Sequence, residues 1–192
     1  MIVLPRRGLL ALFTGTLAGC AAPAPDDRVR MAPGVFLRLP DPAALGRSVE
    51  AVQLVRARHG ADQFVFEAHL SVTPERLMLV CVDPLGRQAL SLRWEQRRLS
   101  VQAADWLPDA IHPENILADL MLTSWPIASL RAGLVGSDAV LAEGAGWRSV
   151  SVAGREMIRA EYGGQTMWNG AATYRNLAWG YELDVQSVEL AP

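Results

Sequence analysis

The sequence predicts an α+β domain in which a long antiparallel sheet curls around two short helices as an incomplete, half-open β-barrel. Three observations lead to this prediction. Apolar and polar residues alternate over successive segments between residues 49 and 103, and the connections between these segments are short. Near residue 113 the apolar residues change to helical spacing. Alternation then returns between residues 147 and 190, and strands, helices and strands in this order are typical of an α+β domain.

The first group of strands is separated by turn residues. Thr73-Pro74-Glu75 interrupts the alternation, and Gln96-Arg97 is a tight connection. Asp83-Pro84-Leu85-Gly86 is a turn signal, because proline presets one φ and glycine permits a positive one. The expected strands are 49–59, 62–73, 76–83, 87–95 and a strand marked by Leu99, Val101 and Ala103.

Two short helices are expected in the middle of the chain. Pro113 suits a first helical turn, and the helix that it begins ends at Trp125-Pro126. Ile127, Leu130 and Leu134 indicate a second helix, which Gly136 closes. The strands expected after it are 147–152, 154–162, 166–173 and 177–190.

Two helices of this size are too short to cover the whole sheet. An open barrel of this kind tends to leave an apolar cavity, which is a ligand site by default. The alternative is a core filled by the protein's own side chains, and the spacing alone does not separate the two.

Composition limits the class of protein. The chain has 192 residues, of which 51% are hydrophobic and 20% are charged, so it is long enough for one domain with its own core. This composition excludes disorder, collagen and a disulfide scaffold. The formal net charge of −2 argues against nucleic acid as a partner.

The first twenty residues predict a lipoprotein signal peptide. Arg6 and Arg7 form a short basic region, and the apolar stretch from Leu9 to Leu17 is too short to span a bilayer. Leu17-Ala18-Gly19-Cys20 resembles the bacterial lipobox, which implies cleavage before Cys20 and acylation of its thiol. The alternative is an uncleaved anchor with an incidental cysteine. We expect a signal peptide over 1–19, an acylated N-terminus and flexible tether over 20–33, and a single domain over 34–192.

Residues typical of catalysis are not arranged in known constellations. The sequence contains no G-x-S-x-G, P-loop, G-x-G-x-x-G or C-x-x-C motif. His59, His69 and His112 are scattered and do not form a zinc-binding pair. Cys81 lies in an apolar run and is expected to be a buried, inert thiol. We therefore expect no enzyme activity, no cofactor and no metal.

Three segments of the sequence resemble the LolB family, the outer-membrane receptor that takes lipoproteins from the periplasmic carrier LolA. The first is RLMLVCVDPLGRQALSLRWEQRRLSVQA over 76–103, with its P-L-G turn. The second is Trp125-Pro126-Ile127-Ala128-Ser129-Leu130-Arg131, followed by Leu134, and the third is Tyr162-Gly163-Gly164. The resemblance spans about 50–190. It implies an incomplete barrel in which the helices form a lid over an apolar cavity.

The resemblance also implies roles for particular residues. The loop Asp83, Pro84, Leu85 and Gly86 would insert into the membrane or pass cargo to it, with Leu85 projecting into solvent. An ordinary exposed turn leucine is the alternative, and it needs no function. The residues expected to form the cavity wall, each with core packing as its alternative, are Phe64, Phe66, Leu90, Leu92, Trp94, Leu99, Val101, Ile116, Leu120, Met121 and Trp125.

The sequence also departs from the receptor, since Asp83 stands where the receptor has Asn. It is similar to a group of LolB-like lipoproteins with a P-x-x-x-L-A-D-L-x-L-x-x-W-P helix and an N-L-x-x-G-Y-x-L strand, here Pro113 to Pro126 and Asn176 to Leu183. Genes of that group often lie beside aryl-polyene or fatty-acyl biosynthesis genes. The cargo is therefore either a lipoprotein or an acyl glycolipid or polyene lipid.

We expect a monomeric outer-membrane lipoprotein on the periplasmic face that binds acyl chains and passes them to the membrane. Its partners would be outer-membrane lipid, acylated cargo and a LolA-like periplasmic carrier. Ala21, where a retention signal would have Asp, implies the outer membrane. Two other classes remain open: a structural lipoprotein that scaffolds an envelope complex, and an accessory hydrolase or acyltransferase acting on lipid.

Overall fold

A computed structural model of the chain describes residues 27–108, 111–136, 139–163 and 167–191. Thirteen strands, two α-helices and one short 3-10 helix lie in these residues. The helices are η1 (Pro42–Leu45), α1 (Pro113–Ser124) and α2 (Ile127–Gly133). The strands are β1 (Arg28–Ala32), β2 (Val35–Arg38), β3 (Val49–His59), β4 (Asp62–Val72), β5 (Arg76–Val82), β6 (Gln88–Glu95), β7 (Arg98–Ala103), β8 (Leu134–Gly136), β9 (Ala139–Gly144), β10 (Trp147–Val152), β11 (Arg155–Tyr162), β12 (Gly170–Asn176) and β13 (Tyr181–Glu189).

Ten of these strands form one strongly curved antiparallel sheet. Their order is β7-β6-β5-β4-β3-β13-β12-β11-β10-β9. The pairing of β3 with β13, in which Gln53 lies opposite Ser187, joins the two halves of the sheet. The outer strands β7 and β9 do not pair with each other in the described residues, so the sheet stays open. The prediction of an α+β fold with an open antiparallel sheet and two helices is confirmed at this level.

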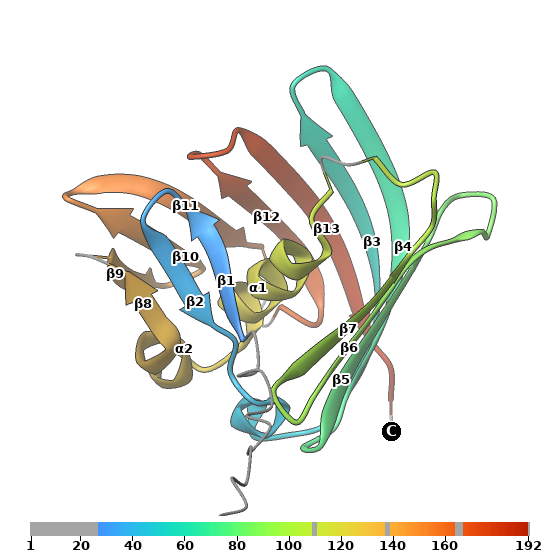
Figure 1. Cartoon of the computed structure of the whole chain (residues 1–192), viewed down its shortest axis with the longest axis horizontal. Coiled ribbons are helices and arrows are strands. Elements are labelled where there is room, and N and C mark those ends of the chain that lie inside the picture. Colours follow the sequence, from blue (N-terminus) through green and yellow to red (C-terminus); the bar gives the residue numbers. More distant parts are fainter. Residues whose placement is uncertain (1–26, 109–110, 137–138, 164–166, 192) are drawn as a thin grey trace, which may run out of the picture.

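A second, three-stranded sheet of order β1-β2-β8 lies on the concave side of the large sheet, beside α1 (Figure 1). The hydrophobic core lies between α1 and the part of the large sheet that is lower in Figure 1. Its largest fully buried side chains include Trp94, Trp125, Leu92 and Met121. The indole N–H of Trp94 donates to the carbonyl oxygen of Pro40 at 2.9 Å, which fixes the segment between β2 and η1 on this core.

The structure differs from the sequence prediction at the N-terminal segment. Residues 28–32 lie in the segment expected to be a tether, but they form β1, which pairs with β2. The reason is burial, because Val29, Met31 and Ala32 pack into the core. The described fold therefore begins earlier than residue 34.

Two later strands also differ from their expected bounds. The predicted strand 177–190 begins only at Tyr181, because Gly180 (φ 71°) is in a left-handed turn and its N–H donates to the Asn176 carbonyl at 2.8 Å. The strand expected over 166–173 is β12, at Gly170–Asn176. Strands β2, β8 and β9 are absent from the prediction. Residues 134–136, expected at the end of the second helix, form β8, because α2 ends at Gly133 and Leu134 pairs with Leu37 of β2.

Candidate functional site

The hairpin tip, defined here as residues 83–87 between β5 and β6, is held by the side chain of Asp83. Its Oδ1 accepts hydrogen bonds from the backbone N–H groups of Leu85 and Arg87, each at 2.9 Å. Its Oδ2 accepts from Nε of Arg87 at 2.8 Å. Gly86 has φ 77°, a left-handed conformation that favours glycine. The motif therefore forms a fixed turn.

The pKa of Asp83 is set by two opposing effects. Burial of the carboxyl raises its pKa. Hydrogen bonds from the backbone and side chain of Arg87 and from the backbone of Leu85 lower the pKa by a larger amount. The net result is a pKa below the ordinary value of 3.8. The carboxylate therefore stays ionised and keeps its hydrogen bonds at neutral pH.

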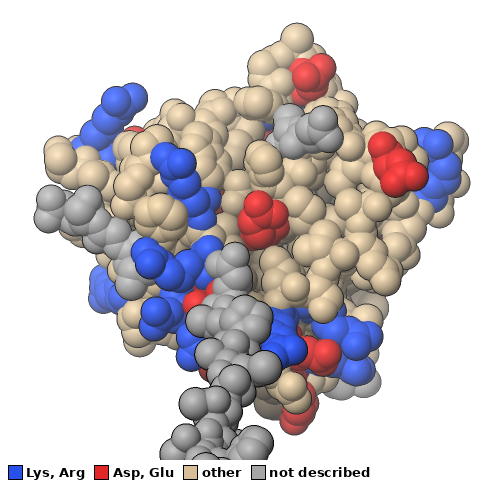
Figure 2. Space-filling view, in the orientation of Figure 1, with Lys and Arg blue, Asp and Glu red and all other residues tan. Residues whose placement is uncertain are grey.

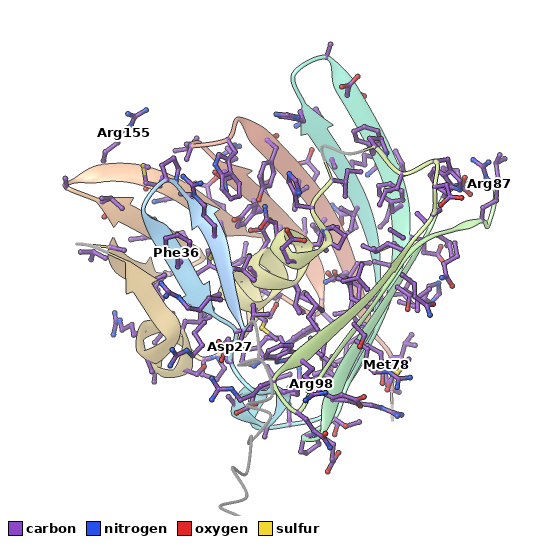
Figure 3. The ribbon with its side chains drawn as sticks, in the orientation of Figure 1. Asp27, Phe36, Met78, Arg87, Arg98 and Arg155 are labelled. Carbon is purple, nitrogen blue, oxygen red and sulfur yellow. The ribbon has the colours of Figure 1, made fainter. Side chains whose placement is uncertain are left out.

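Leu85 is the most exposed large apolar side chain at this tip. It is 80% exposed, whereas Asp83 beneath it is 8% exposed. The guanidinium of Arg87 lies over the ring of Trp106, 4.8 Å from its centroid, and Trp106 is itself exposed. Figure 3 shows Arg87 at the far end of the β5–β6 hairpin, away from the body of the protein. An exposed leucine, an arginine and a tryptophan thus share one projecting end.

A large pocket of about 1130 Å³ lies on the concave side of the sheet. Strands β3, β4, β12 and β13 line it, together with α1 and β1. Its apolar wall includes Phe64 and Phe66, whose rings stack with centroids 6.4 Å apart. In the space-filling view, few charged groups lie in the middle of this face, and most lie toward its edges (Figure 2).

The structure divides the eleven residues expected in a cavity wall into two groups. Six line the pocket: Phe64, Phe66, Leu99, Val101, Ile116 and Leu120. The other five do not line it and are buried in the core: Leu90, Leu92, Trp94, Met121 and Trp125. The division follows the element that carries each residue: the three on β6 are buried in the core, whereas those on β4 and β7 line the pocket.

Helix α1 presents two different faces. Leu117, Ala118, Met121 and Leu122 are buried in the core. The residues facing the pocket recur at helical spacing and are Glu114, Asn115, Ile116, Asp119, Leu120 and Thr123. One of them, Asp119, places a carboxyl group in an otherwise largely apolar wall.

Asp119 is hydrogen-bonded directly to two tyrosines of the sheet. Its Oδ1 accepts from the hydroxyl of Tyr174 on β12, and its Oδ2 accepts from the hydroxyl of Tyr181 on β13 at 2.5 Å. Asn176 adds a longer hydrogen bond from Nδ2 to the Tyr181 hydroxyl, at 3.4 Å. These contacts tie the helix to the sheet.

Burial dominates the acid–base behaviour of this group. Asp119 is 5% exposed, and burial raises its pKa to about 7, although the hydrogen bonds from Tyr174 and Tyr181 lower it. Burial also raises the pKa of both tyrosines, so they remain protonated donors. The Asp119 carboxyl therefore binds a proton more tightly than an exposed aspartate does.

Other residues singled out in the sequence have simple positions. Cys81 is buried, and burial raises its pKa to about 12, which agrees with the expected inert thiol. His59 and His112 lie at the edge of the pocket.

Within the described residues, no three His, Cys, Asp or Glu side chains gather in a way that could hold a metal ion. None of the described helices has the length and apolar character needed to cross a membrane. Cys20 lies outside the described residues.

Two residues of the candidate site, Trp106 and Asp119, were not predicted from the sequence. Trp106 lies in a loop, and only the pairing of β6 with β7 brings that loop beside the hairpin tip. Asp119 had a visible signal, since it is a carboxylate in the middle of the apolar run Ile116-Leu117-Ala118-Asp119-Leu120-Met121-Leu122. A charge at such a position needs a partner, and the partners lie more than fifty residues away in the chain.

Comparison with known proteins gives one family. A search of the curated proteins finds no match. The model of the family described as "Protein of unknown function (DUF3261)" matches residues 50–189, which is well over half of the chain and includes the hairpin tip and most of the pocket-lining strands. The chain therefore belongs to the DUF3261 family.

Proposed function

We propose that this protein is an outer-membrane-anchored lipoprotein that binds acyl chains in the pocket and transfers acylated cargo into the membrane. The observation that carries the proposal is the combination of a large, mainly apolar pocket with a fixed hairpin tip that exposes 80% of Leu85. Both features lie on the same antiparallel sheet. No covalent bond is made or broken in this function.

The pocket suits an acyl chain by size and surface. Each methylene group that leaves water for the apolar wall contributes about 0.8 kcal/mol. Phe64 and Phe66 supply a broad aromatic surface, and Ile116 and Leu120 of α1 face the same space. In this proposal α1 acts as the lid, because it covers one side of the pocket and is tied to the sheet by Asp119.

The hairpin tip suits contact with a bilayer. Burying the Leu85 side chain in lipid contributes roughly 1.5–3 kcal/mol. The turn is already fixed by Asp83, so little ordering cost opposes this gain. Tryptophan and arginine both carry a large apolar part with a polar end, which suits Trp106 and Arg87 to the headgroup region around the inserted leucine.

The resemblance to the LolB family supports the remaining parts of the proposal. It implies anchoring through acylated Cys20, the outer membrane as the location, and a LolA-like periplasmic carrier as the partner. The cargo is a lipoprotein or an acyl glycolipid or polyene lipid. The protein works as a monomer, because one chain holds both the pocket and the tip.

The test is acyl transfer by the full chain reconstituted in donor vesicles, with a fluorescent acyl lipid moving to acceptor vesicles. A Leu85→Glu variant should fold and bind the lipid normally but lose transfer, because a charged tip does not enter the bilayer. Val140→Glu is the matched control, since Val140 is an exposed apolar residue on β9, at the opposite edge of the sheet from β7. Equal transfer by the Leu85→Glu variant and the wild type would remove the tip from the mechanism.

Native mass spectrometry of the full chain, purified gently from bacterial membranes, tests the pocket separately. A retained acyl species would support carriage, and its mass would distinguish the two classes of cargo. A protein that retains no lipid and takes up none when lipid is added would instead support a scaffolding lipoprotein.

A further inference from the structure

The pocket wall contains three buried polar side chains, and they differ in what they offer to a ligand. Gln53, Asp119 and Thr123 all line the pocket and are 5%, 5% and 6% exposed. The hydroxyl of Thr123 donates to the carbonyl oxygens of Asp119 and Leu120, at 2.9 and 2.8 Å. Thr123 is therefore satisfied by its own helix, which leaves Asp119 and Gln53.

Asp119 has more acceptor capacity than the protein uses. A carboxylate has about four lone-pair positions, and the described residues supply two donors, the hydroxyls of Tyr174 and Tyr181. Both tyrosines also line the pocket, so the hydrogen-bonded group borders the space that a ligand would occupy. Within the described residues no arginine or histidine forms an ion pair with Asp119, so its charge is compensated only by neutral hydroxyl groups.

Gln53 adds a second polar point on the sheet. Its Nε2 donates to Oγ of Ser187 on the paired strand β13, at 2.9 Å. In the described residues no group donates to its Oε1. Its neighbours on the same face of the sheet are apolar, namely Val55 and Ala57 on β3 and Val185 on β13. Asp119 and Gln53 thus place two oxygen acceptors in an apolar wall, and the unpaired Oε1 of Gln53 is open to solvent.

The exposed charged residues of the pocket differ from this pair. Arg58 is paired with Glu182 and Asp184 on the neighbouring strand. The other exposed charged residues of the pocket are Arg28, Arg30, Asp62 and Glu114. Such groups interact with water and discriminate weakly between ligands. Asp119, by contrast, is 5% exposed, so an apolar chain that fills the space beside it leaves no water to supply a further hydrogen bond.

We propose that Asp119, held by Tyr174 and Tyr181, is a polar subsite that accepts a hydrogen bond from a hydroxyl or amide N–H group of the bound acyl amphiphile. This inference rests on the proposed acyl-binding function and adds the class of head group. The subsite selects chains that carry a hydrogen-bond donor, and Gln53 offers a second acceptor farther along the sheet. A chain that lacks the donor desolvates the Asp119 carboxylate and leaves its remaining lone pairs without a hydrogen bond.

The experiment compares two chains that differ in the donor. 1-Hexadecanol and methyl hexadecyl ether compete for the full chain at about pH 8.5, where the Asp119 carboxylate is ionised, and native mass spectrometry counts the two complexes. We expect the wild type to prefer the alcohol by about tenfold, the lower range for a hydrogen bond to a charged acceptor. Asp119→Asn should reduce this preference to about threefold or less, because a neutral amide is a weaker acceptor.

Two further variants separate ligand recognition from structure. Tyr181→Phe removes one donor from Asp119 and frees an acceptor position, so it should keep or increase the preference for the alcohol even if it unfolds at a lower temperature. Asp62→Asn changes an exposed carboxyl at the pocket edge and should leave the preference unchanged.

The outcomes distinguish this inference from the proposed function. Equal binding of the alcohol and the ether by the wild type, or an unchanged preference in Asp119→Asn, overturns the subsite while acyl binding stands. Binding of neither chain by the wild type overturns the proposed acyl-binding function itself.

Discussion

Asp119 predicts an unusual dependence of stability on pH. Its pKa in the folded protein is about 7, raised by burial from an ordinary value of 3.8. The folded state therefore binds a proton more tightly than the unfolded state between these values. The contribution of Asp119 to the free energy of unfolding is fully present below about pH 4 and is lost as the pH rises through about 7. The Asp119→Asn substitution removes this titration and keeps an oxygen acceptor for one tyrosine.

The size of the effect follows from the two pKa values. Each unit of difference corresponds to about 1.36 kcal/mol, and most of the titration falls between pH 5 and pH 8. Over that interval the wild type should lose about 3 kcal/mol of unfolding free energy from this group. Tyr174 and Tyr181, which face Asp119, have raised pKa values and do not titrate there.

The assay is urea unfolding of the full chain, wild type and Asp119→Asn, at several pH values from 5 to 8. From pH 5 to pH 8, the unfolding free energy of Asp119→Asn should rise by about 3 kcal/mol relative to that of the wild type. Leu92→Ala, a core variant that keeps Asp119, should retain the wild-type slope. Parallel slopes for the wild type and Asp119→Asn would refute the reasoning, because burial would then not raise the pKa of Asp119.

Other residues give further predictions. Asp83→Ala should speed amide hydrogen exchange at Leu85 and Arg87 and lower the unfolding temperature, since their N–H groups lose an acceptor. Because the folded pKa of Asp83 is lowered, its contribution is present above the unfolded pKa and disappears as the pH falls through the folded one. Leu92→Ala should cost about 2–5 kcal/mol in thermal unfolding and leave acyl binding intact. Phe66→Ala, in the half-exposed pocket wall, should cost less stability and weaken acyl binding, as native mass spectrometry would show.

The sequence predicted the large sheet well because its strands carry local information. Strand β4 follows the expected alternation, with Phe64, Phe66, Ala68 and Leu70 on one face. The turn at Asp83–Gly86 was readable because its residues set the backbone angles themselves. Strands β1 and β8 were missed, because they are short and their burial depends on contacts with distant parts of the chain.

The limits of the site prediction have a similar cause. An inward apolar side chain is compatible with both core and pocket, so Leu92 and Phe66 look alike in the sequence. They differ in the structure because Leu92 lies on β6, beneath α1, whereas Phe66 lies on β4, beside the pocket. The contact of Asp119 with Tyr174 and Tyr181 depends on how the helix docks on the sheet, which no local pattern records.

The distance between the expected lipid anchor and the hairpin tip gives a final prediction. Asp27 pairs with Arg97 at the end of β6 that lies opposite the tip (Figure 3). Strand β6 has eight residues and therefore seven steps of about 3.4 Å, so it separates Asp27 from the tip by about 24 Å. The seven residue steps between Cys20 and Asp27 span at most about 25 Å. If acylated Cys20 and Leu85 enter one bilayer, the tether must therefore be almost fully extended, or β6 must lie obliquely to the membrane.

Tether length should therefore control transfer. Deleting Pro23, Ala24 and Pro25 leaves a reach of at most about 14 Å, which forces β6 still flatter against the membrane and should slow the transfer of a fluorescent acyl lipid between vesicles. Inserting three residues of the same composition is the matched control and should leave the rate unchanged or higher. An unaltered rate after the deletion would mean that Leu85 acts without reaching the bilayer that holds Cys20, for example on an opposing membrane or on the carrier. The same comparison in a Leu85→Glu background should show no effect of tether length, because the step that the tether limits is already lost.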